Sequence, residues 1–112
     1  MSGKKNPVVT ESSGNVFADL GLPDSDELLA KAELVSKISS IIKGRHLTQA
    51  QAAEVLGATQ PIVSNLLRGR LAGFSMERLM RFLNALGRDV EIVVKRRPRS
   101  RETAQTRVAV AG

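Results

Sequence analysis

The sequence lacks cysteine, tryptophan and tyrosine, and its 112 residues include one histidine and three phenylalanines. The absence of cysteine excludes disulfides, thiolate nucleophiles and cysteine-ligated metal sites, and one histidine, His46, leaves too few ligands for a typical transition-metal site. Three aromatic rings are too few to stack single-stranded bases or to form a membrane belt. No apolar run approaches the ~20 residues of a membrane span, and the first residues contain no apolar signal core. We therefore expect a soluble cytoplasmic protein without metal or cofactor.

Positive charge predominates and is unevenly distributed, with a net charge of +6 from 17 basic and 11 acidic residues. The first 33 residues have three basic and six acidic side chains, residues 34–94 have eight and four, and residues 95–112 have six and one. A basic centre and end are typical of a protein with a polyanionic partner, nucleic acid first. For the end itself three readings stay open: nonspecific contact with phosphates, docking on an acidic partner, or plain solvation.

Composition divides the chain into three parts. Residues 1–15 are polar and aperiodic, which predicts a disordered tail. One folded domain is predicted at residues 16–95, and it begins with an extended lead-in at 16–22. The Arg-rich residues 96–112 predict a basic disordered tail. Four helices are expected from apolar spacing and stop signals, near 25–44, 49–56, 60–68 and 76–86. The expected core-facing positions of the first helix are Leu28, Ala32, Leu34, Val35, Ile38, Ile41 and Ile42, and those of the fourth are Met76, Leu79, Leu83 and Leu86.

Polar residues mark the starts of these helices. Asp24, three residues before Glu27, predicts a capping-box-like start for the first helix, and Thr48 with Gln51 predicts the same for the second. Pro61 falls in the first turn of the third helix, where its missing N–H has no helical partner anyway. The four predicted helices therefore have start signals that agree with their apolar periodicity.

After the fourth helix the apolar period changes to two. Val90, Ile92 and Val94 alternate with other residues over 90–95, which predicts a strand. A lone strand must pair with a second copy, with the lead-in segment or with another protein. The expected fold is mainly α, with four to five helices and one C-terminal β-strand paired in a dimer.

Residues 48–67 predict two short helices joined by a tight turn. Such helices cross closely, which requires a small residue on the first helix and a glycine in the turn, and Ala53 and Gly57 occupy these places. The inner face is supplied with apolar groups at Ala52, Leu56, Ala58, Val63 and Leu66. The outer face of the second helix carries Gln60, Pro61, Ser64, Asn65 and Arg68. A polar, donor-rich face on a short helix is typical of a major-groove reader.

With this arrangement the sequence resembles the helix-turn-helix family of Cro/repressor type, the XRE family. The resemblance rests on Leu47-Thr48-Gln49, Ala53, Gly57, Thr59-Gln60, Val63-Ser64, Leu66 and Arg68-Gly69. Residues 74–79 and 86–92 are similar to the compact branch that includes HigA-type antitoxins. The resemblance implies autoregulation of an operon and, for antitoxins, neutralisation of a partner ribonuclease toxin.

By the same resemblance, the third helix carries the residues that read bases. Gln60 and Ser64 match the base-reading positions of the family, with Asn65 and Arg68 beside them. A neutral polar surface is the alternative, although Ser64 and Asn65 are poor helix formers that propensity alone does not explain. For Arg68 the alternative is a favourable interaction with the negative end of its own helix.

The resemblance also assigns phosphate contacts. Gln49 matches the family glutamine that touches a phosphate and braces the recognition helix, Thr59 matches the cap that faces a phosphate, and Arg70 lies in a loop that contacts the DNA backbone. The alternative for Gln49 is a solvated helix residue, and the alternative for Arg70 is an interaction with the helix dipole alone.

These residues predict a sequence-specific DNA-binding regulator, a repressor that binds a palindromic operator as a homodimer and is associated with the nucleoid. A HigA-type antitoxin, whose amino-terminal segment or edge strand binds a small toxin, is the alternative. The expected partners are double-stranded DNA and a second copy, with no membrane. The sequence shows no nucleophile–base pair, metal-ligand set or phosphate loop, so we expect no catalytic residues and no enzyme.

Overall fold

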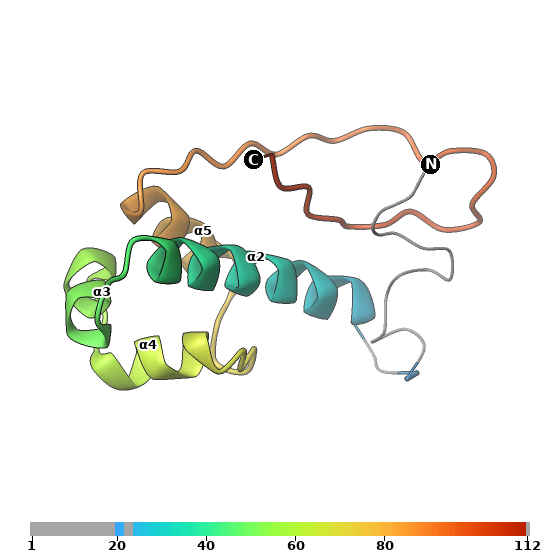
Figure 1. Ribbon diagram of the computed structural model, residues 1–112. Coiled ribbons are helices and arrows are strands. Elements are labelled where there is room, and N and C mark those ends of the chain that lie inside the picture. Colours follow the sequence, from blue (N-terminus) through green and yellow to red (C-terminus); the bar gives the residue numbers. More distant parts are fainter. Residues whose placement is uncertain (1–19, 22–23, 112) are drawn as a thin grey trace.

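The computed structural model describes residues 20–21 and 24–111 (Figure 1). Within them lie four helices: α2 (Ser25–Gly44), α3 (Gln49–Leu56), α4 (Gln60–Leu67) and α5 (Met76–Ala85). The prediction of a mainly helical fold is confirmed, and the helix bounds agree with the expected ones to within one or two residues. The predicted tail at 1–15 and nearly all of the lead-in at 16–22 lie outside the described residues. Within the described ranges, no helix combines the length and apolar composition that a bilayer span requires.

The long helix α2 forms the centre of the fold, and both α4 and α5 pack against it while α3 packs on α4 (Figure 1). Its core face is narrower at the amino end than expected, because Leu28 and Ala32 are only partly buried and Ala30 is buried instead. The residues of α2 that enter the core are Ala30, Leu34, Val35, Ile38, Ile41 and Ile42. On α5, Leu79 and Leu83 are buried as predicted, together with Phe82, and Leu86 follows them into the core.

The start of α2 corrects one prediction. Asp24 precedes the helix as expected, but its backbone is left-handed, with φ 54° and ψ 36°, and its side chain makes no capping hydrogen bond. Side-chain capping needs an extended residue before the helix, the conformation that Thr48 has at φ −72° and ψ 165°. The capping-box prediction for Asp24 and Glu27 was therefore wrong, although acidic Asp26 and Glu27 do lie in the first turn.

Beyond α5 the chain has no helix or strand as far as residue 111. Figure 1 shows this segment running back along α2, turning in a loop and returning towards the body of the protein. We call residues 90–95 the outgoing arm and residues 106–111 the returning arm. Val90 on the outgoing arm and Val108 on the returning arm both pack against the core. The strand at 90–95 needs a pairing partner that one chain does not provide, so it stays a prediction, as does the assignment of residues 96–112 as a disordered tail.

Candidate nucleic-acid interface

The amino end of α3 is fixed by a capping box. The Gln51 N–H donates to Thr48 Oγ1 at 3.1 Å, and the Thr48 N–H donates to Gln51 Oε1 at 2.8 Å, as the spacing predicts. The helix ends at Gly57, which is left-handed at φ 66°, a conformation that glycine adopts without strain. The Ala58 N–H then donates back to the Ala53 carbonyl at 2.9 Å. Both ends of α3 are thus defined, and α4 starts after a short turn.

The two helices meet on an apolar inner face. Ala52, Val63 and Leu66 are fully buried, Leu56 is nearly so, and Ala58 is partly buried against the core. All five residues of the predicted inner face therefore pack as expected. Ala53 is also buried, with 7% of its surface exposed, so its small side chain lies where α3 packs into the rest of the fold.

Replacing Ala53 by leucine should destabilise the protein by about 1 to 3 kcal/mol, because the added atoms must be forced into a filled core. The control is Ala50→Leu, the same substitution at an exposed position of α3. Urea unfolding of both variants measures the difference. If the two unfolded at the same denaturant concentration, the close packing of α3 at Ala53 would be contradicted.

The outer face of α4 holds the side chains predicted to read bases. Gln60, Pro61 and Arg68 are exposed, and Ser64 and Asn65 are half-buried. At 100° per residue these five positions occupy an arc of about 140°, and Val63 and Leu66 lie on the other side of the helix. The structure therefore gathers these residues on one surface. Their contact with DNA remains a prediction.

At the amino end of α4, the Gln60 N–H and the Thr59 hydroxyl proton are the groups that can donate to a phosphate. Pro61 has no N–H, the Ile62 N–H donates to Thr59 Oγ1 at 3.4 Å, and the Val63 N–H donates to the Thr59 carbonyl at 3.1 Å. Three of the four first-turn amides are thus absent or used within the helix. The Thr59 hydroxyl accepts one of these bonds and keeps its own proton, which it can donate to a phosphate oxygen beside the Gln60 amide.

Arg70 lies beside the outer face of α4. Its N–H donates to the Asn65 carbonyl at 3.0 Å, and its Nη1 lies 3.5 Å from Asn65 Oδ1. The chain turns there through Gly69 at φ 75°. The exposed guanidinium of Arg70 is thereby brought next to a predicted base-reading residue. Gln49 is exposed at the first position of α3, and its predicted bracing of α4 stays a prediction.

Two supporting residues were not predicted from the sequence. Ser39 Oγ donates to the Leu66 carbonyl at 3.3 Å, which fastens the carboxyl end of α4 to α2. Its position four residues after Val35 and three before Ile42 places it on the core stripe, and that spacing is the signal that identifies it. Arg45 Nη2 donates to the Leu86 carbonyl at 2.6 Å and so ties the end of α2 to the end of α5.

Comparison with known proteins agrees with this geometry. A family profile described as a helix-turn-helix domain matches residues 16–95. A solved structure of a protein named as an XRE family transcriptional regulator is 47% identical in sequence and superposes with a TM-score of 0.75, over 80% of this chain and 100% of the other. The search of curated proteins found no match.

Proposed function

The chain belongs to the XRE-type helix-turn-helix family, and on that premise we propose that it is a transcriptional repressor that binds a palindromic operator as a homodimer. Regulators of this family bind DNA and are generally not enzymes. The observation that carries the proposal is the outer face of α4, where polar side chains gather over a fully buried apolar face.

Each part of this surface has a distinct role in the proposal. Gln60 and Ser64 donate to and accept from base edges in the major groove, with Asn65 and Arg68 beside them. Thr59 and the Gln60 amide contact a phosphate at the start of α4, and Gln49 and Arg70 contact phosphates on either side. The phosphate contacts fix the register of the helix in the groove, and the base contacts supply sequence preference.

The outgoing arm after α5 supports the homodimer. Ile92, Val93 and Val94 are 72%, 70% and 92% exposed, three consecutive β-branched residues facing solvent. Antiparallel pairing of residues 90–95 with the same segment of a second copy satisfies the backbone N–H and C=O groups of this edge, places these β-branched side chains beside their counterparts and gives a two-fold dimer. Two recognition helices related in this way can enter successive major grooves about 34 Å apart.

Ile92→Pro and Val93→Pro test the pairing. Successive N–H groups of a strand point to opposite edges, so one of the two prolines removes a donor to the partner strand and should weaken the dimer. Sedimentation equilibrium measures dimer dissociation, and operator affinity should fall together with the dimer. Ile92→Thr, which keeps the N–H and the β-branched shape, is the control and should stay dimeric.

Dimers of unchanged stability in both proline variants would contradict this interface. The second copy would then associate through another surface, and the segment at 90–95 would be left for a different partner.

Autoregulation is tested by an electrophoretic mobility shift with the DNA directly upstream of the protein's own gene. We expect a shifted band that a tenfold excess of unrelated duplex does not abolish, because sequence-specific affinity exceeds nonspecific affinity by ~10³ or more. A shift removed equally by any duplex would contradict repression of this operon.

A HigA-type antitoxin is the second candidate, favoured by the same exposed apolar residues 92–94, which suit a protein partner. In that case a small ribonuclease toxin binds to residues 92–94. The amino-terminal residues, which lie outside the described part of the chain, are the alternative binding segment. A neighbouring gene for a small basic ribonuclease-like protein, and co-purification of the two products, would support it. Their absence would leave the free-standing repressor.

A further inference from the structure

The strongest positive charge of the described chain lies away from the helix-turn-helix. Residues 95–107, the basic loop, contain six cations and one acidic residue, Glu102; the cations are Lys95, Arg96, Arg97, Arg99, Arg101 and Arg107. Residues 48–70, which include α3 and α4, contain two cations, Arg68 and Arg70, and one acidic residue, Glu54. Affinity for the phosphate backbone depends on the number of cations that meet phosphates, so the basic loop holds more of this capacity than residues 48–70 do.

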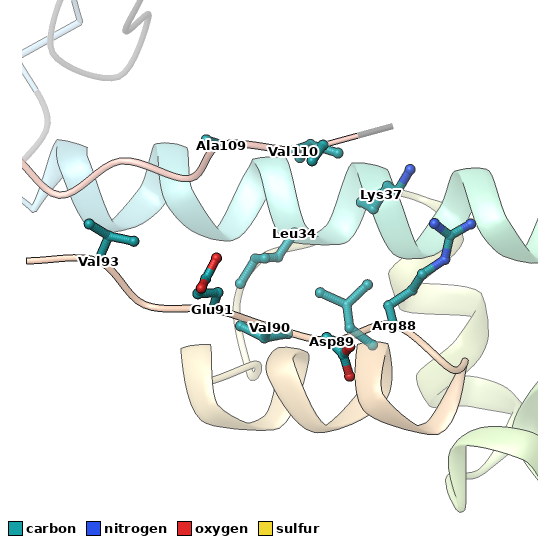
Figure 2. A pocket seen from close by; sticks show the side chains of 11 residues that line it. Leu34, Lys37, Arg88, Asp89, Val90, Glu91, Val93, Ala109 and Val110 are labelled. Atoms are coloured by element: carbon teal, nitrogen blue, oxygen red, sulfur yellow. The ribbon is translucent and has the colours of Figure 1, made fainter.

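The basic loop is held at both ends. Val90 before it and Val108 after it pack against the core, and the Thr106 N–H donates to Asp26 Oδ2 of α2 at 3.3 Å. Leu34 of α2, Val90 and Val93 before the loop, and Ala109 and Val110 after it line one partly open pocket of about 420 Å³. Figure 2 shows the side chain of Leu34 pointing towards Val90. A loop anchored in this way loses less conformational entropy on binding than a free tail does.

The position of the loop separates it from the recognition helix. In Figure 1, α4 lies on one side of α2, and the basic loop extends on the opposite side. The cations of the loop are exposed or half-buried. A duplex seated against α4 therefore does not meet this loop of the same chain.

We propose that the basic loop is a second phosphate-binding surface, which holds duplex DNA without regard to sequence, so that one molecule bound through α4 can hold a second DNA segment. The phosphate binding of the loop is independent of the proposed function, and only the simultaneous holding of two segments rests on it. No base-reading helix lies in the loop, and its arginines can meet phosphates from several directions.

The first test is the salt dependence of binding to a 20-bp duplex of arbitrary sequence. Arg97 and Arg101 donate to backbone carbonyls within the loop, so the substitutions are placed at exposed Arg96 and Arg99. In the variant with Arg96→Gln and Arg99→Gln, the slope of log affinity against log salt should shrink by about 0.9 for each phosphate that is no longer neutralised, about 1.8 for two.

Two controls isolate the charge of the loop. Arg96→Lys with Arg99→Lys keeps the charge and should keep the slope. Arg81→Gln removes a cation from the exposed face of α5, where Arg81 pairs with Glu77 at 3.1 Å. This substitution should also leave the slope unchanged. A slope that is the same in the glutamine variant as in the unaltered protein would overturn the proposal and leave the loop to an acidic protein partner or to solvent.

The second test asks whether two duplexes are held together. An immobilised operator duplex saturated with protein should capture a fluorescent duplex of unrelated sequence at low salt, and the glutamine variant should lose this capture. No capture by the unaltered protein would overturn the bridging role. If Gln60→Ala with Ser64→Ala left operator specificity intact while the loop substitutions still reduced the slope, the proposed function would fail and the loop assignment would stand.

Discussion

A protein with both Gln60 and Ser64 replaced by alanine should bind its operator roughly 30-fold to 2 × 10⁴-fold more weakly, because each position should contribute about 1 to 3 kcal/mol. Both side chains lie on the outer face of α4, Gln60 exposed and Ser64 half-buried. Their removal leaves the inner face unchanged, and alanine is the best helix former, so the thermal midpoint should stay close to that of the unaltered protein. Affinity for unrelated duplex should also change little, because phosphate contacts do not depend on these side chains.

The matched control replaces Ser36 and Ser40 by alanine, two exposed polar residues of α2. Fluorescence anisotropy with operator and unrelated duplexes measures the ratio of specific to nonspecific affinity for all three proteins. An unchanged ratio in the α4 variant would mean that another surface reads the bases.

Leu66→Ala should lower the free energy of unfolding by about 2 to 5 kcal/mol, a large part of the stability of a domain of this size. Leu66 is fully buried in the core at the end of α4. Truncating it removes apolar packing and leaves a cavity that its surroundings fill only in part. The Ser39 hydroxyl bond to the Leu66 carbonyl is a main-chain interaction that remains.

Val55→Ala is the control for this destabilisation, because Val55 lies on α3 and is 42% exposed. It should change the unfolding free energy by no more than about 0.5 kcal/mol. Urea denaturation of the two variants compares them directly. Equal stabilities would contradict the packing of α4 on the core, and with it the support that the core gives to the outer face of α4.

The helix-turn-helix could be predicted in detail from the sequence because its determinants are local. Thr48 with Gln51, and Gly57 at the end of α3, act within a few residues of each other, and the structure shows the capping bonds and the left-handed glycine that they predict. The inner face follows from helical period alone, which explains why Val63 and Leu66 are buried as expected. Helix propensity, capping residues and apolar spacing all indicate the same helix bounds in this part of the chain, so the local prediction agrees with the fold.

Contacts between distant segments could not be predicted in the same way. Ser39 and Leu66 are 27 residues apart, and Arg45 and Leu86 are 41 apart. Arg78 lies over the rings of Phe74 and Phe82, 5.7 and 5.4 Å from their centres, an arrangement that depends on how the loop before α5 folds back. The Asp24 prediction failed because the residue type suggested a side-chain cap, whereas the backbone of Asp24 is left-handed and its side chain makes no capping hydrogen bond.

The segment after α5 shows a further limit of local pattern. The alternation of Val90, Ile92 and Val94 indicates a strand, but pairing depends on a partner that the pattern does not identify. The contacts of Thr106 with α2 and of Val108 with the core are likewise tertiary contacts. They could not be predicted, because the Arg-rich sequence between the two arms has no apolar periodicity.

We propose that the outer face of α4 reads a DNA sequence. Selection from a random duplex library by the unaltered protein, with the Gln60→Ala and Ser64→Ala protein selected in parallel, tests it most directly. We expect the unaltered protein to enrich an inverted repeat whose half-sites are centred about 34 Å apart, roughly one helical turn, and the variant to lose that enrichment. A pool that stays random with the unaltered protein, or an identical motif selected by the variant, would contradict the claim.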